Sequence, residues 1–134
     1  PALTLTKLST GFLLTYNHMI VGIADEERAD RLFGALANST RRDIVRRTLK
    51  DDYSVSQLAR CYTTSFAAIQ KHVSILEAAG LVSKRSSGRE QIVTGDINTI
   101  EDVHALLGQF EAIWRERLGR FDSVLNDSDQ GGRR

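Results

Sequence analysis

Apolar residues recur along much of this 134-residue chain at the three- and four-residue spacing of helices. The first clear helical face comprises Ala29, Leu32, Phe33 and Leu36. Asn38 follows it and can cap a second helix, because its side chain accepts from the free N–H groups of the first turn. That second helix would bury Ile44, Val45 and Leu49, and the charged stretch 50–52 would end it. The pattern therefore predicts two consecutive amphipathic helices from about residue 25 to residue 50.

Two further helices are predicted between residues 54 and 80. Ser54 and Gln57 form an S-x-x-Q capping box, which marks the start of a short helix. After a turn at 62–64, Ser65 can cap a fourth helix. One face of this helix comprises Ala68, Ile69, His72, Val73 and Leu76. Gly80 ends it, because glycine tolerates the left-handed backbone that follows a helix.

The pattern then changes its period. The short β-rich runs 81–85 and 90–93 surround a Ser/Gly turn and predict a hairpin. Asn98 and Glu101 resemble a capping box and would start a final helix. Its apolar stripe is longer than a helix on a small core requires, so we expect a dimer interface rather than closure of the chain's own core. The predicted interface residues are Val103, Leu107, Phe110, Trp114, Leu118 and Phe121.

The two ends of the chain lack such patterns. Residues 1–22 have no clean period and are assigned to an N-terminal extension or arm. Two explanations stay open: the natural start lies near Met19, the only methionine, or the arm packs on a partner subunit. The polar residues 127–134 are predicted to be a disordered tail.

Composition narrows the class of protein. Hydrophobic residues make up 41% and charged residues 26%, as in soluble globular domains. No run approaches the roughly 20 apolar residues that cross a bilayer, and residues 12–21 do not form a convincing signal peptide. The single cysteine, Cys61, excludes an internal disulfide framework. We expect a cytoplasmic protein with no membrane partner.

The predicted order of elements is helix, helix, short helix, tight turn, helix and basic hairpin. This is the order of a winged helix-turn-helix, so the expected fold class is mainly α with a small β-hairpin (α+β). In such a domain the helix after the turn enters the major groove with its N-terminal half facing the bases. The net charge is only +1, so DNA binding has to depend on where the charges lie.

The outer face of the fourth helix and the hairpin carry groups that suit DNA. Gln70 can pair bidentately with adenine, and Lys71 can reach guanine or a phosphate. Hydroxyls at helix starts suit phosphates, and hairpin cations suit the narrow minor groove. The predicted DNA-binding residues are Ser56, Thr64, Ser65, Phe66, Ala67, Gln70, Lys71, Ser74, Lys84, Arg85 and Arg89. For Phe66, contact with a thymine methyl and cover of the turn beside Tyr62 both stay open, whereas His72 is assigned a structural role.

Residues 32–93 resemble the ArsR-type winged-helix repressors. Residues 33–42, FGALANSTRR, are similar to that family's FkALADPTRR opening, with Asn38-Ser39 in place of Asp-Pro. Residues 58–82 are similar to its LA…S…SRHLxxLxxAGLV pattern, with Thr63 where such turns usually carry glycine. The resemblance covers roughly half of the chain. It implies a homodimer whose terminal helices pair, usually a repressor and often autoregulated.

ArsR-type repressors are often metal sensors, and the resemblance shows where their ligands would lie. One family site uses clustered cysteines, because thiolates bind soft metals, but the third helix here holds only Cys61. The other site begins as D-x-H, as in Asp102 and His104, but its later positions hold Arg115 and Leu118. We therefore predict no metal site and no cofactor. His104 is assigned to the surface or an interface, and Cys61 to buried packing rather than to a redox switch.

These observations together predict a sequence-specific transcription regulator, a dimeric repressor that binds double-stranded DNA at a near-palindromic operator. The expected organisation is an arm (1–22), a DNA-binding domain (23–97), a dimerisation helix (98–126) and the tail (127–134). Two alternatives stay open: a winged-helix module for an acidic protein partner, and a metal- or redox-responsive sensor. No small-molecule effector is identified. The chain lacks a catalytic Ser/His/Asp order, a paired-carboxylate signature and a phosphate-binding glycine loop, so we do not expect an enzyme.

Overall fold

The computed structural model describes residues 26–131, so the predicted arm at 1–22 lies outside the described residues. The chain divides into two compact units, with the boundary between Ile97 and Asn98. The described part is mainly helical with a small antiparallel sheet, which confirms the predicted fold class. No helix within these residues is both long and apolar enough to cross a membrane.

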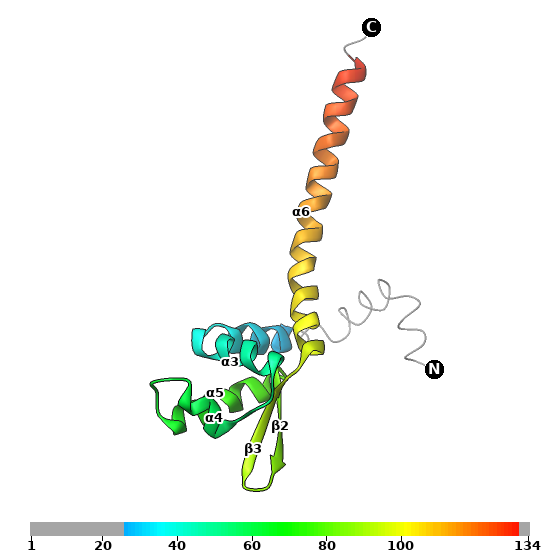
Figure 1. Cartoon of the computed structure of the whole chain (residues 1–134). Helices are drawn as coiled ribbons and strands as arrows, with labels where there is room; N and C mark the ends of the chain where they lie inside the picture. Colours follow the sequence, from blue (N-terminus) through cyan, green and yellow to red (C-terminus); the bar gives the residue numbers. More distant parts are fainter. Residues whose placement is uncertain (1–25, 132–134) are drawn as a thin grey trace, which may run out of the picture. The chain divides into compact units, whose positions relative to one another are not determined.

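Helices make up most of the described part of the first unit (Figure 1). Three of them begin after the residues that the sequence marks as caps. The side chains of Asn38, Ser54 and Ser65 each accept a hydrogen bond from the backbone N–H three residues later. Gln57 completes the capping box by accepting from the N–H of Ser54 at 2.8 Å. The described helices of this unit are residues 26–36, α3 (Ser39–Lys50), α4 (Val55–Arg60) and α5 (Phe66–Ala78).

The end of α5 confirms the role predicted for Gly80, whose φ is +80°. The N–H of Gly80 donates to the carbonyl of Glu77, and the N–H of Leu81 donates to that of Leu76, both at 2.9 Å. This pair of bonds is a Schellman motif, which satisfies the last carbonyls of a helix. It turns the chain directly into the first hairpin strand.

The sheet contains one strand that the sequence did not indicate. Its order is β1-β3-β2, and both pairings are antiparallel. The hairpin β2–β3, called the wing below, is confirmed; both strands end two residues later than predicted, and β2 begins one residue later. The added strand β1 escapes detection because it has only two residues. The strands are β1 (Tyr53–Ser54), β2 (Val82–Ser87) and β3 (Glu90–Gly95).

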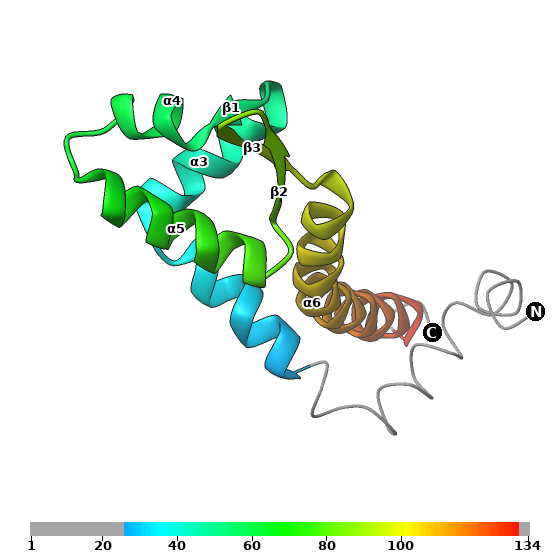
Figure 2. The ribbon, with the colours of Figure 1, turned by 90° about the horizontal axis from the view of Figure 1, so that it is seen from below.

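One core joins the elements of the first unit. Helix α5 contacts α3, α4 and β2, and α3 packs against β3 (Figure 2). Leu49 was expected to be buried but is 40% exposed, because it lies at the end of α3 over Gly95, which has no side chain to cover it. Phe33 is also partly exposed. The most fully buried apolar side chains are Leu32, Ile44, Leu58, Ile69, Val73, Leu76, Leu81 and Val93.

The second unit begins at Asn98, and its described part is formed by α6 (Ile97–Gly131), a helix of 35 residues whose first residue still belongs to the first unit. It corrects the sequence prediction at both ends. The helix begins at Ile97, so Asn98 lies inside its first turn and does not cap it. It also continues to Gly131, so the disorder predicted for residues 127–131 is wrong. Residues 127–129 are exposed, so helical hydrogen bonding and not burial extends the element past the stripe.

Candidate nucleic-acid interface

Helices α4 and α5, joined by the turn at 61–65, form a helix-turn-helix. The buried face of α5 carries Ile69, Val73 and Leu76, each no more than 1% exposed. The opposite face carries the predicted recognition residues, all exposed to solvent: Phe66, Ala67, Gln70, Lys71 and Ser74. The helical period therefore places the predicted set on the surface of the unit, where a DNA groove has access to it.

The short hydroxyl residues lie at the starts of these two helices. Ser56 is exposed in the first turn of α4, and Thr64 is exposed in the turn before α5. The Ser65 Oγ accepts from the Ala68 N–H at 3.1 Å, which leaves its own proton available to a phosphate oxygen. Helix starts favour anions, because their first N–H groups have no partner within the helix. These positions therefore suit contacts with the phosphates of the DNA backbone.

A groove of about 330 Å³ separates α5 from the wing. It brings Gln70, Lys71 and Ser74 of the helix together with Lys84 of β2. Gln91, which the sequence did not single out, also lines it from β3, because it alternates onto the same face of the hairpin as Lys84. The groove joins base-reading and phosphate-binding chemistry on one surface.

The three wing cations fall into different environments. Lys84 lies 3.6 Å from the Glu77 carboxylate, on the side of the groove. The next residue, Arg85, points to the other face of the strand, where it donates to Asp52 at 2.9 Å. The Thr94 hydroxyl donates to the same carboxylate, and these two bonds, Thr94 first, lower the Asp52 pKa. Arg85 is therefore held away from the groove.

Arg89 occupies the tip of the wing beside Gly88. Gly88 has a φ of +62° in a two-residue hairpin loop, a conformation that glycine adopts without strain. Arg89 is exposed, and within residues 26–131 it has no ion-pair partner. The tip therefore presents a cation that is free to enter a minor groove.

A side-chain cluster that the sequence analysis missed joins α3 to the turn. The Tyr62 hydroxyl donates to Oδ2 of Asp43 at 2.6 Å, and Arg47 Nε donates to the same oxygen at 2.8 Å. The Arg47 guanidinium also lies 5.7 Å from the centroid of the Tyr62 ring. The spacing of Asp43 and Arg47 at i, i+4 was visible in the sequence, but such pairs are common on exposed helices. Nothing in the sequence indicates that Tyr62 meets them.

His72 joins α5 to α3 from the middle of the recognition helix. Its Nδ1 lies 3.2 Å from Nη1 of Arg41, so the neutral ring accepts a hydrogen bond there. Arg41 also donates to the carbonyls of Ala35 and Gly34. Burial, followed by the positive charges of Arg41 and Lys71, lowers the His72 pKa below its ordinary value. This environment agrees with the structural role assigned to His72.

Cys61 is exposed, which corrects the expectation of a buried cysteine. It follows the last residue of α4, where the chain leaves the core to form the turn, and its thiol donates to the Gln57 carbonyl at 3.3 Å. The residues that the structure describes contain no group of three or more His, Cys, Asp or Glu side chains placed to hold a metal ion.

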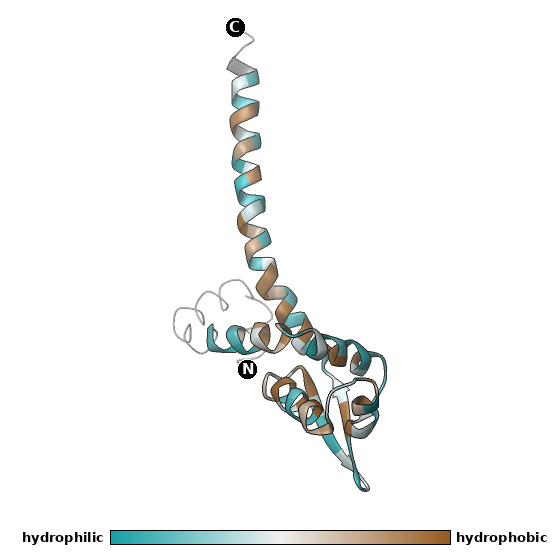
Figure 3. Ribbon diagram, turned by 90° about the vertical axis from the view of Figure 1, so that its left-hand side faces the viewer, coloured by the Kyte–Doolittle hydropathy of each residue, from teal (hydrophilic) through white to brown (hydrophobic). Residues whose placement is uncertain are grey.

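The predicted interface residues of α6 divide into two groups. Val103 is only 9% exposed, whereas Leu107, Phe110, Trp114, Leu118 and Phe121 are 46–67% exposed. Ile113, Val124 and Leu125, which were not named, are exposed on the same helix. Figure 3 shows apolar residues recurring along α6. So many exposed apolar side chains on one helix are typical of a surface that another polypeptide covers.

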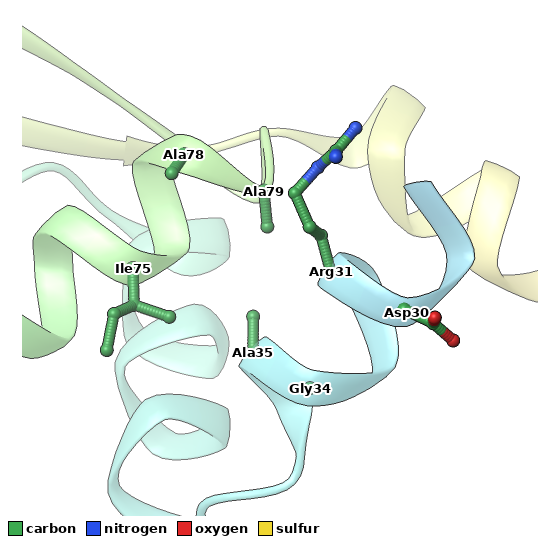
Figure 4. A pocket seen from close by; sticks show the side chains of 7 residues that line it. All are labelled: Asp30, Arg31, Gly34, Ala35, Ile75, Ala78 and Ala79. Carbon is green, nitrogen blue, oxygen red and sulfur yellow. The ribbon is translucent and has the colours of Figure 1, made fainter. Parts of the chain in front are cut away.

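A second pocket, of about 290 Å³, lies between the helix at 26–36 and the end of α5 (Figure 4). Ala35, Ile75 and Ala79 point into it, whereas Asp30 and Arg31 point away. A small-molecule site needs polar groups that converge on the ligand, and this pocket has none among its lining residues. Among the described residues, the polar groups that converge on one groove are therefore those of α5 and the wing.

Comparison with known proteins supports the same interpretation. No protein-family model matches the chain. The chain is 33% identical over 97 residues to the HTH-type transcriptional regulator Rv2034 of Mycobacterium tuberculosis, an alignment that spans 72% of this chain and 88% of that protein.

Comparison with solved structures identifies proteins that share the fold of this chain. An ArsR-like transcriptional regulator from Rhodococcus sp. RHA1 is 29% identical, with a TM-score of 0.67 over 75% of this chain and 95% of that one. A homodimeric winged helix-turn-helix DNA-binding domain from Mycobacterium bovis, a possible ArsR-family regulator, shares the fold. It has 23% identity and a TM-score of 0.54, over 70% of this chain and 84% of that one.

Proposed function

Since this chain belongs to the ArsR family of winged helix-turn-helix transcriptional regulators, we propose that it represses transcription as a homodimer bound to a near-palindromic operator. Members of this family are regulators and not enzymes. Operator binding requires access to the chromosome, so the proposed location is the cytoplasm.

The groove between α5 and the wing is the observation that carries the proposal. It gathers Gln70, Lys71 and Ser74 beside Lys84, with Arg89 at the tip of the hairpin. An amide can read adenine in the major groove, and an ammonium can reach guanine or a phosphate. The guanidinium at the tip suits the electronegative minor groove. A protein-binding module has no comparable need for this combination.

The exposed stripe of α6 supports the homodimer. Two copies can cover each other's Leu107, Phe110, Trp114, Leu118 and Phe121, which are otherwise exposed to water. A relative with the same fold is itself described as homodimeric. A two-fold dimer presents two recognition helices to successive major grooves, about 34 Å apart along the DNA.

Selection of genomic fragments by the full chain, followed by footprinting, tests the proposal. We expect enrichment of a near-palindromic sequence with two protected half-sites whose centres lie about 10 base pairs apart. Lack of sequence enrichment would contradict operator recognition. Protection of one isolated half-site would contradict the dimer and leave DNA recognition in place.

A further inference from the structure

We infer that Asp43, Arg47 and Tyr62, called the turn clasp below, set the orientation in which α5 meets DNA. They are positioning residues and do not contact DNA themselves. The inference rests on the proposed DNA-binding function and extends it to residues outside the groove.

The turn that the clasp holds has one short backbone hydrogen bond at its start, from the Cys61 N–H to the Leu58 carbonyl at 3.0 Å, and weaker support beyond it. The Tyr62 N–H lies 3.5 Å from the Ala59 carbonyl, at the limit of a hydrogen bond. Helix-turn-helix turns often contain glycine, which tolerates a left-handed backbone. Here Thr63 occupies the turn, and none of the described residues other than glycine has a positive φ. The turn therefore follows a path that side-chain bonds have to fix.

The clasp supplies those bonds from a rigid helix. Tyr62 and Arg47 both donate to one oxygen of Asp43, at 2.6 and 2.8 Å. Hydrogen bonds to an ionised acceptor are stronger than those between neutral groups. These bonds lower the Asp43 pKa, and burial together with the Asp43 bond raises the Tyr62 pKa. Near neutral pH both groups are therefore in the protonation states that the clasp requires.

Besides the core packing of Ile69, Val73 and Leu76, two polar contacts tie the recognition helix to α3. The clasp fixes Tyr62, four residues before α5 begins, to α3. The hydrogen bond between Arg41 and His72 fixes the middle of α5 to the same helix. Loss of the first contact would let the N-terminal half of α5 shift, and that half carries Gln70. The contact between the Gln70 amide and a base depends on geometry within about 0.5 Å, so a small shift of the helix weakens operator recognition.

Arg46 and Arg47 provide a matched pair of test positions. Both guanidinium groups pair with the Asp43 carboxylate, Arg46 at 3.4 Å through Oδ1 and Arg47 at 2.8 Å through Oδ2. Only Arg47 lies over the Tyr62 ring. Arg46→Gln and Arg47→Gln therefore remove the same charge from the same helix, but only the second removes a member of the clasp. If the substitutions changed only the electrostatic attraction to DNA, the two variants would lose a similar amount of DNA affinity.

The experiment measures affinity for the selected operator and for a scrambled duplex, over a salt series, with folded protein whose active fraction is known. We expect Arg47→Gln to bind the operator about tenfold more weakly than Arg46→Gln, because a hydrogen bond to a charged group is lost. Binding to the scrambled duplex and the salt slope should be the same for the two variants. Tyr62→Phe should weaken operator binding too. The double variant should bind more tightly than the product of the two separate losses in affinity predicts, because both substitutions act on one clasp.

Equal operator affinity for Arg46→Gln and Arg47→Gln would overturn the inference. So would a lower salt slope for Arg47→Gln alone, which would make Arg47 a phosphate contact. A purely stabilising role would lower the unfolding temperature without changing the affinity of the folded protein. The proposed function fails separately, if the wild-type protein does not distinguish the operator from the scrambled duplex.

Discussion

Gln70 lies on the exposed face of α5 and lines the groove, so its amide is free to read a base edge. Gln70→Ala should relax the base preference at one operator position, at a cost of about 1–3 kcal/mol in discrimination. The ranking of operator variants by affinity measures this. Gln109→Ala, which removes an exposed amide from α6, outside the groove, is the matched control. An unchanged ranking for Gln70→Ala would show that another residue reads that base.

The environment of His72 predicts how the stability of the folded protein depends on pH. Its pKa in the folded protein lies below the ordinary value of 6.5, because burial and then Arg41 and Lys71 disfavour the imidazolium. Between these two pKa values the unfolded chain binds more protons, so the free energy of unfolding should fall as the pH drops below about 6.5. A protonated ring also loses the hydrogen bond from Arg41.

Denaturant titrations from pH 8 to pH 5 measure this dependence. His72→Gln should remove it, and His104→Gln, at an exposed position on α6, should keep it. A His72→Gln variant with the full wild-type dependence would place the responsible group elsewhere.

Single residues also show what the sequence could and could not predict. Asn38, Ser54 and Ser65 were identified as caps because a cap depends on neighbours within three residues. The exposure of Cys61 depends on where the chain leaves the core, which no local pattern records. The bond between Tyr62 and Asp43 joins residues 19 positions apart, so spacing rules do not apply to it.

In the wing, Arg89 lies at the exposed tip, whereas Arg85 lies on a strand and is paired with Asp52. The two cations should therefore contribute differently to DNA binding. Arg89→Gln should weaken binding to every duplex by a similar factor and lower the salt slope by about 0.9, because one phosphate contact is lost. Arg85→Gln should have a smaller effect, since Arg85 is paired with Asp52 on the other face. Anisotropy titrations over a salt series compare the two. A larger effect for Arg85→Gln would mean that Arg85 exchanges Asp52 for DNA on binding.

Element boundaries followed the sequence where a cap or a glycine marks them. Gly80 ends α5 as predicted, and Gly88 lies in the hairpin loop. The two-residue strand β1 was missed, because its pairing with β3 is a long-range contact. The last turns of α6 were missed because residues 127–131 have a polar composition, whereas a helix that has already formed adds residues at little cost.

The assembly of the whole molecule depends on α6. Removal of the chain from Phe110 onward deletes most of the exposed stripe, so this variant should sediment as a monomer. Removal from Asn126 onward leaves the stripe intact and should leave a dimer. Circular dichroism would show that both variants are folded. A dimer that persists after truncation at Phe110 would place the interface elsewhere.

The fold described for the first unit was predictable, apart from β1, because the helices and the hairpin each carry their own signal and their order is distinctive. The surface chemistry was predictable where helical or strand alternation alone places a side chain, as for Gln70 and Lys71. The alternation that separates Lys84 from Arg85 was readable too, but the ion pair with Asp52 was not. Contacts between side chains of different elements can be identified only once the fold is known.

Operator recognition by the folded protein is the central claim, and fluorescence anisotropy tests it most directly. The full chain is titrated against the selected site and a scrambled duplex of equal length and composition, from low to physiological salt. We expect binding at least about a thousandfold tighter to the selected site at physiological salt, with log affinity falling steeply as log salt rises on both duplexes. Equally weak binding to the two duplexes at every salt concentration would contradict the claim.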